Sequence, residues 1–335
     1  MRHFFILFAI AGLLINPSAA EACTGITLKS KDGTTIVART IEWGGSNLNS
    51  QYVVVPRGYT ERSYTPNGVD GMTFTARYGY VGLAVEYGEY EKYNAAVRDK
   101  SISDLQLVSW LLGECSNVEE VKEAVKKVHV INIDPRASTV HWRFAEPSGR
   151  QLVLEIIKGE LHFYENTLGV LTNSPSFEWH LTNLNNYVNL FPGTAPNQQL
   201  GNIELSSFGA GSGFLGIPGD VTPPSRFVRA AFYQASAPQQ ETALETVFQC
   251  FQILNNFDIP VGIEFPLGQV PCDIPSATQW TSVTDMRNHV IYYRTMYNSV
   301  IRNIDLRSID FSTVRYRAVS MDGTKRQAVE TIKIE

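Results

Sequence analysis

The chain reads Ala20-Glu21-Ala22-Cys23-Thr24-Gly25 at the point around which we expect the rest of the protein to be organised. Upstream stand Met1-Arg2-His3, an apolar run from Phe4 to Ile15, and small residues that end at Ala22. A basic start, an apolar run too short to cross a bilayer and an A-x-A-like site are typical of a secretory signal peptide. We therefore expect cleavage after Ala22, which makes Cys23 the first residue of the mature protein.

A cysteine in first position carries two reactive groups. Its thiol can attack a carbonyl carbon, and its free α-amine, with a reference pKa of about 7.7–8.0, can accept the thiol proton. Two other readings stay open, a cysteine that only packs or pairs and a lipid-modified cysteine. A lipoprotein signal wants an aliphatic residue three positions before the cysteine and a small one two before, where this chain has Ala20 and Glu21. We expect a periplasmic or secreted protein rather than a lipid-anchored one.

Composition excludes several classes of protein. The chain is 44% hydrophobic and 18% charged, with a net charge of −5 and no basic block, so a nucleic-acid partner is not expected. No apolar run after the signal peptide approaches 18 residues, so stable membrane insertion is not expected either. Residues 23–335 show no repeat, linker or shift in composition, which favours a single domain.

The first strands are predicted most clearly. Gly25–Lys29 and Thr34–Glu42 alternate in polarity on either side of Lys31-Asp32-Gly33, which is a hairpin signal. This hairpin places Cys23 at the start of one strand, and Arg39 and Glu42 near the far end of its partner. Further strands are predicted at Tyr52–Pro56, Met72–Arg77, Val81–Tyr87, Thr139–Ala145, Gln151–Ile157, Glu160–Tyr164, Gly169–Thr172, Thr278–Thr284, Val290–Thr295, Ile301–Asp305 and Lys325–Ile334.

Two pairs of helices interrupt the strands. Ser103 can cap a helix that runs to about Gly113, with an apolar stripe of Leu105, Val108, Leu111 and Leu112. Ser116-Asn117-Val118-Glu119 is a capping-box pattern for the next, whose apolar face is Val118, Val121 and Val125. The second pair is predicted at Ser225–Ala235 and Thr242–Asn255, where Thr242-Ala243-Leu244-Glu245 is again a capping box. Strands, two helices, strands, two helices and strands predict an α+β fold in which two sheets pack face to face between helical layers, αββα.

Other chemistries find little support. No two histidines after the signal peptide lie three to five residues apart and no C-x-x-C occurs, so neither a metal nor a cofactor is expected. The run Gly209-Ala210-Gly211-Ser212-Gly213 lacks glycine two before and two after its serine, as a serine-hydrolase elbow requires. Cys115 and Cys250 stand on apolar helical patterns, where we expect buried thiols. A histidine brought to Cys23 by the fold stays possible, although the α-amine makes it unnecessary.

Five short motifs occur in a suggestive order: Cys23-Thr24-Gly25, Arg39-Thr40-Ile41-Glu42-Trp43, Leu171-Thr172-Asn173-Ser174-Pro175, Pro218-Gly219-Asp220 and Ser225-Arg226-Phe227-Val228-Arg229. In this order the chain resembles the choloylglycine hydrolase family, the bile salt hydrolases and penicillin V acylases, which are N-terminal-nucleophile amidases. Trp43 after the acidic residue resembles members from Gram-negative bacteria. The resemblance implies the αββα fold and hydrolysis of a linear amide without a cofactor.

The resemblance also implies a role for each of five residues. Cys23 matches the nucleophile, and Arg39 matches an arginine whose charge favours the thiolate. Glu42 stands where the family usually has an aspartate, near the nucleophile's amine. Asn173 matches a side-chain donor at the oxyanion site, and Arg226 matches a second arginine that organises the polar cluster.

The chain departs from the family pattern in two places. Glu42 is longer than aspartate by one methylene, or about 1.5 Å. The chain is also about two dozen residues shorter than the family pattern between Arg39 and Asn173. The shortened part falls near Val85–Tyr93, where relatives carry a turn that supplies a second oxyanion residue and discriminates between substrates.

Several functions remain open on these residues. A glycine- or taurine-conjugated bile salt is the first expected substrate, and penicillin V or an N-acyl amide such as an acyl-homoserine lactone is the second. A catalytically impaired secreted binding protein on the same scaffold is a further alternative. The resemblance also suggests a homotetramer.

Overall fold

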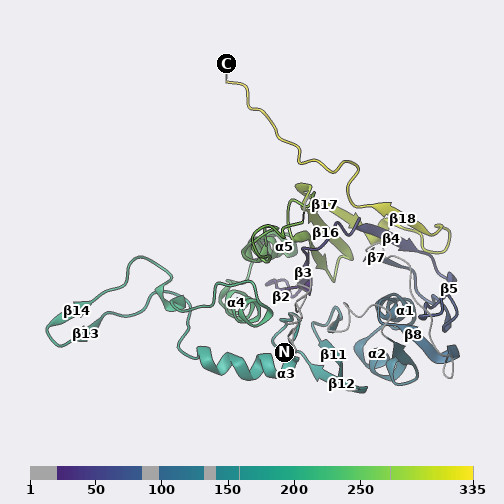
Figure 1. The fold of residues 1–335 in the computed structure, drawn as a ribbon, viewed down its shortest axis with the longest axis horizontal. Helices are drawn as coiled ribbons and strands as arrows, with labels where there is room; N and C mark the ends of the chain where they lie inside the picture. The colour runs from purple at the N-terminus through teal and green to yellow at the C-terminus, as the bar shows by residue number, and fades with distance from the viewer. Residues whose placement is uncertain (1–20, 85–97, 132–140, 158, 272, 335) are drawn as a thin grey trace, which may run out of the picture.

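A computed structural model describes residues 21–84, 98–131, 141–157, 159–271 and 273–334. Within these residues, two helices pack on a six-stranded sheet, toward the left of Figure 1, and two more helices, at its right, pack on a three-stranded sheet. This is the expected αββα arrangement in an α+β fold. No helix in the described ranges is both long and apolar enough to cross a membrane.

The larger sheet carries the predicted hairpin, and its neighbouring strands are antiparallel. Its order is β1-β3-β15-β16-β17, and β2 also pairs with β3. Asp32 Oδ1 accepts hydrogen bonds from Ser30 Oγ (2.6 Å) and from the Thr34 nitrogen (2.9 Å), which closes the turn between β2 and β3. The strands are β1 (Glu21–Ala22), β2 (Gly25–Lys29), β3 (Thr35–Trp43), β15 (Thr278–Asp285), β16 (Val290–Thr295) and β17 (Asn298–Asp305).

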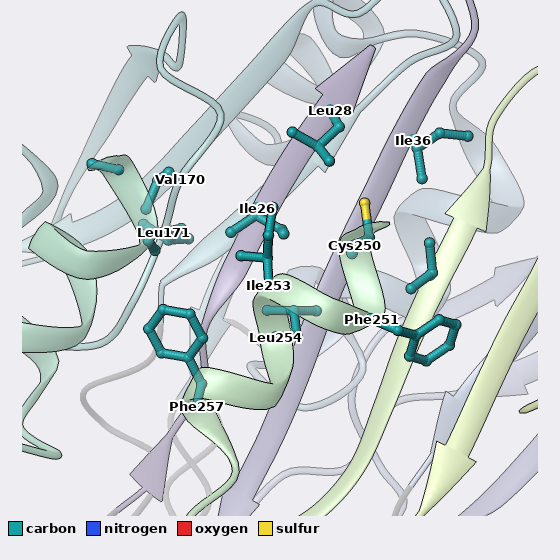
Figure 2. Close-up of a cluster of buried hydrophobic side chains, with 14 of the residues drawn as sticks. Ile26, Leu28, Ile36, Val170, Leu171, Cys250, Phe251, Ile253, Leu254 and Phe257 are labelled. Atoms are coloured by element: carbon teal, nitrogen blue, oxygen red, sulfur yellow. The ribbon is translucent and has the colours of Figure 1, made fainter. Parts of the chain in front are cut away.

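Two helices cover the outer face of this sheet. Ile26, Leu28 and Ile36 project from β2 and β3 into an apolar cluster with Cys250 and Leu254 of the second helix (Figure 2). The capping box predicted at Thr242 and Glu245 is present at the start of that helix. The helices are α4 (Pro223–Ser236) and α5 (Ala243–Leu254).

A smaller antiparallel sheet forms the second β layer. Alternate residues of its central strand, Leu152 and Leu154, pack against two helices on the far side. Arg143 reaches the other way, to the carbonyl oxygens of Ile26 (3.3 Å) and Ala38 (3.3 Å), and so ties the two sheets together. The elements are β10 (Trp142–Ala145), β11 (Gln151–Ile157), β12 (Glu160–Glu165), α1 (Leu107–Glu114) and α2 (Val118–Val125).

Smaller elements complete the described fold. The strand pair β13–β14 extends away from the layers at the left of Figure 1, and its side chains are exposed. The remaining elements are β4 (Gln51–Val55), β5 (Thr60–Arg62), β6 (Thr73–Thr75), β7 (Tyr80–Ala84), β8 (Ser101–Ser103), β9 (His129–Ile131), α3 (Phe177–Asn183), β13 (Gln198–Leu200), β14 (Ile203–Leu205) and β18 (Arg317–Ser320).

The prediction for the first helix is wrong at its start. Ser103 belongs to β8, which pairs in parallel with β9, and the helix begins at Leu107. Leu111 is buried as expected, but Val108 (41%) and Leu112 (44%) are exposed, so the prediction that all three side chains face the core is wrong. The cause is tertiary: Ser103 pairs with Ile131 in the short β8–β9 strand pair, and residues 104–106 form a turn before the helix. Cys115, at the helix end, is half-buried rather than buried, whereas Cys250 is buried as predicted.

The prediction of a strand at Lys325–Ile334 is also wrong. These residues form no strand, and Val329, Ile332 and Ile334 are exposed. A segment with an alternating pattern forms a strand only where a neighbouring strand is free to pair with it. Here β4 is already paired with β18 on one side and with β7 on the other. Gly169–Thr172 makes only a single bridge, between Gly25 and Leu171. Parts of two other predicted strands, residues 85–87 and 139–140, lie outside the described residues.

Candidate active site

The hairpin register sets Cys23 beside Arg39. Gly25 pairs with Arg39 across β2 and β3, so Cys23 lies just before the paired residues. Arg39 Nη2 donates a hydrogen bond to Cys23 Sγ at 3.0 Å. The Arg39 guanidinium also lies 5.6 Å from the centre of the Trp280 ring, a cation–π contact that orients it. A thiol and a permanent positive charge therefore meet at the end of the hairpin.

Asn173 reaches Cys23 through a backbone bridge. The Gly25 nitrogen donates to the Leu171 carbonyl (2.8 Å), and the Leu171 nitrogen donates back to Gly25 (3.1 Å). This bridge brings the segment after Leu171 alongside the start of β2. The backbone nitrogen of Cys23 then donates to Asn173 Oδ1 at 2.6 Å. The side-chain oxygen of Asn173 thus points at the nitrogen of the candidate nucleophile.

Arg226 is the centre of the polar cluster. It lies on α4 and is fully buried. Its Nη1 donates to the Cys23 carbonyl (2.8 Å) and to Thr24 Oγ1 (2.8 Å), and its Nη2 donates to Asn173 Oδ1 (3.1 Å). Its Nε donates to the Val221 carbonyl (2.9 Å). One rigid guanidinium therefore joins the segments that carry Cys23, Asn173 and the start of α4.

The Glu42 carboxylate is buried, at 2% exposure, and neither of its oxygens lies within hydrogen-bond geometry of a partner in the described part of the chain. Burial raises the pKa of Glu42 from 4.5 to about 8, although the charge of Arg226, the nearby Thr40 hydroxyl and the charge of Arg39 oppose the rise. On the backbone, Glu42 stands opposite Ala22 in the β1–β3 pair. Glu42 thus stands on the strand directly opposite the residue that precedes Cys23.

The electrostatics of Cys23 differ from the simple expectation of an arginine-activated thiolate. Cys23 retains some exposed surface, yet the atoms around its sulfur desolvate it. This burial raises the pKa of the thiol, Glu42 raises it further, and Arg39 and Arg226 only partly offset the rise. A thiol with a raised pKa stays protonated near neutral pH, so attack on a carbonyl requires a base.

The structure brings the five predicted site residues together. The side-chain oxygen of Asn173 accepts from Cys23 and Arg226, which leaves its predicted role as a donor to the oxyanion to the amide nitrogen. Its amide nitrogen is therefore directed away from these two groups and can serve a ligand. No group of three or more potential ligands among His, Cys, Asp and Glu in the described ranges could hold a metal ion.

Two residues of the cluster were not singled out from the sequence. Thr24 is fully buried and accepts from Arg226. His180 is fully buried on α3, a helix that was not predicted, and contacts the carbonyl oxygen of Asn173. A signal for α3 existed, because Ser176 can cap a helix and Phe177, His180 and Leu184 share its inner face at helical spacing.

We predict that Glu42 makes stability depend on pH in a chain that keeps Ala22 ahead of Cys23. Because the folded-state pKa of about 8 lies above the ordinary value of 4.5, stability should fall as pH rises between these two values. At about 1.4 kcal/mol per pKa unit, the loss is about 4–5 kcal/mol. Glu42→Gln should remove this loss, as measured by urea unfolding at pH 5 and pH 8.

A matched control is Glu160→Gln, since the Glu160 side chain is 83% exposed. This control should keep the pH dependence of the wild-type protein. Equal pH slopes for wild type and Glu42→Gln would contradict the buried, unpaired state of Glu42.

Known proteins resemble this chain in sequence and in fold. Residues 23–316 match the family described as linear amide C-N hydrolases, choloylglycine hydrolase family. The chain is 30% identical over 312 residues to a bile salt hydrolase/transferase from Clostridium perfringens, covering 85% of this chain and 92% of the relative. It is 37% identical over 229 residues to a bile salt hydrolase/transferase from Lactiplantibacillus plantarum, covering 66% and 67%. A solved structure of a mutant conjugated bile acid hydrolase from Clostridium perfringens superposes with a TM-score of 0.76 at 26% identity, covering 93% of this chain and 100% of that one.

Proposed function

This chain belongs to the choloylglycine hydrolase family of linear amide C-N hydrolases, and from that premise we propose that it deconjugates glycine- or taurine-conjugated bile salts with Cys23 as nucleophile. One observation carries the proposal. The thiol of Cys23 contacts Arg39 at 3.0 Å while its backbone nitrogen contacts Asn173 at 2.6 Å. Both groups that an N-terminal cysteine uses are therefore held by polar side chains.

The mechanism starts with removal of residues 1–22, which turns the Cys23 nitrogen into an α-amine. This amine takes the thiol proton, with Asn173 Oδ1 orienting the nitrogen. The raised thiol pKa supports the need for such a base, and Arg39 stabilises the thiolate once it forms. Glu42 stands opposite the former position of Ala22, and the positive charge of the resulting ammonium lowers the raised pKa of this carboxyl, so that Glu42 ionises and balances the ammonium charge.

The thiolate then adds to the amide carbon of the substrate. Asn173 donates from its amide nitrogen to the oxyanion, while its oxygen remains bound to Arg226. The intermediate collapses by breaking the C–N bond, and the ammonium of Cys23 returns its proton to the departing glycine or taurine. Water, deprotonated by the same amine, attacks the thioester and releases the bile acid and the free thiol.

A substrate panel tests this function on the protein that begins at Cys23. We expect release of glycine or taurine from conjugated bile salts to be faster than release of phenoxyacetate from penicillin V or of the amine from an N-acyl-homoserine lactone. Fastest cleavage of either other substrate would shift the assignment to the acylase alternative. Saturable binding of a bile salt without amine release from any of the three would favour the impaired binding protein. The chain is shortened near Val85–Tyr93, where relatives carry the turn that discriminates between substrates, and these residues lie outside the described part of the chain.

Two further proposals concern the location of the protein and its oligomeric state. We propose export to the periplasm or the medium, on the signal-peptide pattern of residues 1–22. We also propose a homotetramer, for which the exposed apolar residues Leu200 (65%), Ile203 (62%) and Phe208 (104%) in and after the β13–β14 pair offer a contact surface. The molecular mass in solution tests the second proposal.

A further inference from the structure

His180 lies directly behind Asn173. It is 0% exposed, and its Nε2 lies 2.8 Å from the carbonyl oxygen of Asn173. Its next polar neighbour is Thr172 Oγ1, at 3.4 Å. Because a carbonyl oxygen can only accept, Nε2 must carry the proton and donate to Asn173. The contact therefore shows that the neutral His180 ring carries its proton on Nε2 and that this proton is donated to Asn173.

The ring has little freedom to turn away from this contact. It stacks on Phe227 of α4 with ring centroids 4.5 Å apart and planes 8° apart, and the Trp179 ring meets it edge-on at 5.5 Å. Its other nitrogen, Nδ1, is buried without a hydrogen-bond partner among the described residues. Burial lowers the pKa of His180, which favours the neutral ring with one proton on Nε2.

The helix that carries His180 is itself fixed at its first turn. Ser176 caps α3 by accepting from the Trp179 nitrogen, and Glu155 Oε1 accepts from the Phe177 nitrogen at 2.6 Å. Glu155 belongs to β11, so α3 is tied to the second sheet. The His180 ring is thus held by its own helix, by Phe227 of α4 and, through the Glu155 contact, by β11.

Asn173 is consequently held at both ends. Arg226 and the Cys23 nitrogen engage its side-chain oxygen, whereas His180 engages its backbone carbonyl. Without the His180 contact, the backbone of Asn173 could rotate and carry the side-chain amide out of line with the substrate. A misplacement of about 1 Å at a catalytic group can cost about 100-fold in rate.

We propose that His180 is a positioning residue that keeps the Asn173 side chain aligned with Cys23. The inference rests on the proposed function, because the alignment matters for catalysis only if Cys23 is the nucleophile. It assigns no contact between His180 and the substrate.

Two substitutions of similar length separate hydrogen bonding from packing. His180→Gln keeps an N–H donor for the Asn173 carbonyl, while His180→Met fills similar space without one. We expect kcat for amide hydrolysis to fall about 10- to 100-fold in His180→Met, with KM changed by less than about threefold. His180→Gln should restore kcat to within about threefold of the wild type.

His162 provides the matched control. It lies on β12, is partly exposed and stacks on Tyr164, so His162→Met should leave kcat unchanged. Equal kcat for the Gln and Met variants at position 180 would overturn the proposal. So would a His180→Met protein that does not fold while His180→Gln does, because His180 would then support the fold rather than the alignment.

A crystal structure of His180→Met separates this inference from the proposed function. We expect the Asn173 Oδ1 to Cys23 nitrogen contact, 2.6 Å in the wild type, to lengthen or break in the variant. If the wild type hydrolyses no amide, the proposed function fails, and this distance still decides the inference. An unchanged contact would overturn the positioning role even if the rate fell.

Discussion

Replacing Cys23 by alanine is expected to lower kcat for amide hydrolysis by about 10⁴-fold or more, as removal of a nucleophile does in other covalent hydrolases. Alanine keeps the backbone nitrogen that donates to Asn173 and the carbonyl that accepts from Arg226. The fold and the substrate pocket should therefore persist while the attacking atom is lost. The amine released under saturating bile salt measures the effect.

Two controls make this result specific. Cys115→Ala removes another thiol, which is half-buried at the end of α1 with its pKa raised to about 11, and should leave kcat unchanged. The intact mass of the exported protein must also begin at an unmodified Cys23. A mass that begins elsewhere, or a lipid on Cys23, would remove the base and contradict the mechanism, as would full activity of Cys23→Ala.

Replacing Arg226 by methionine is expected to lower the free energy of unfolding by about 3–5 kcal/mol and to remove turnover. The substitution deletes a fully buried guanidinium, whose donors satisfy the carbonyls of Cys23 and Val221 and the side-chain oxygen of Asn173. Removing one partner of a buried charge cluster leaves the others uncompensated, at about this cost. Glu42 also loses the largest favourable charge near it.

Urea unfolding at a fixed pH measures the loss for Arg226→Met. The matched control is Arg150→Met, since Arg150 pairs with Glu119 and Glu165 at the surface. Its removal should cost about 1 kcal/mol or less. Equal losses in the two variants would show that Arg226 does not hold the cluster together.

The hairpin half of the site could be predicted from local pattern. Alternating residues on both sides of Lys31-Asp32-Gly33 determine the register of β2 and β3, and the register determines that Cys23 lies near Arg39. The capping box at Thr242 and the inward face of Val118, Val121 and Val125 were predictable for the same reason. Each depends on residues a few positions apart.

Asn173 and Arg226 could not be placed by local pattern. They lie 150 and 203 residues from Cys23 and reach it only because the Gly25–Leu171 bridge and the packing of α4 bring three segments together. The order of motifs suggested these two residues through the family resemblance. Only the layered fold shows that the Asn173 oxygen, rather than its nitrogen, faces Cys23.

By itself, the sequence determined the αββα class, the β2–β3 hairpin and which residues are chemically able to act in a catalytic site. The tertiary structure decided how these residues are paired and charged. Burial leaves the Glu42 carboxylate without a hydrogen bond among the residues that the structure describes and raises the pKa of the Cys23 thiol, and α3 brings His180 behind Asn173. Periodicity reports which face of an element is apolar, whereas desolvation and long-range hydrogen bonds depend on how separate elements pack against one another.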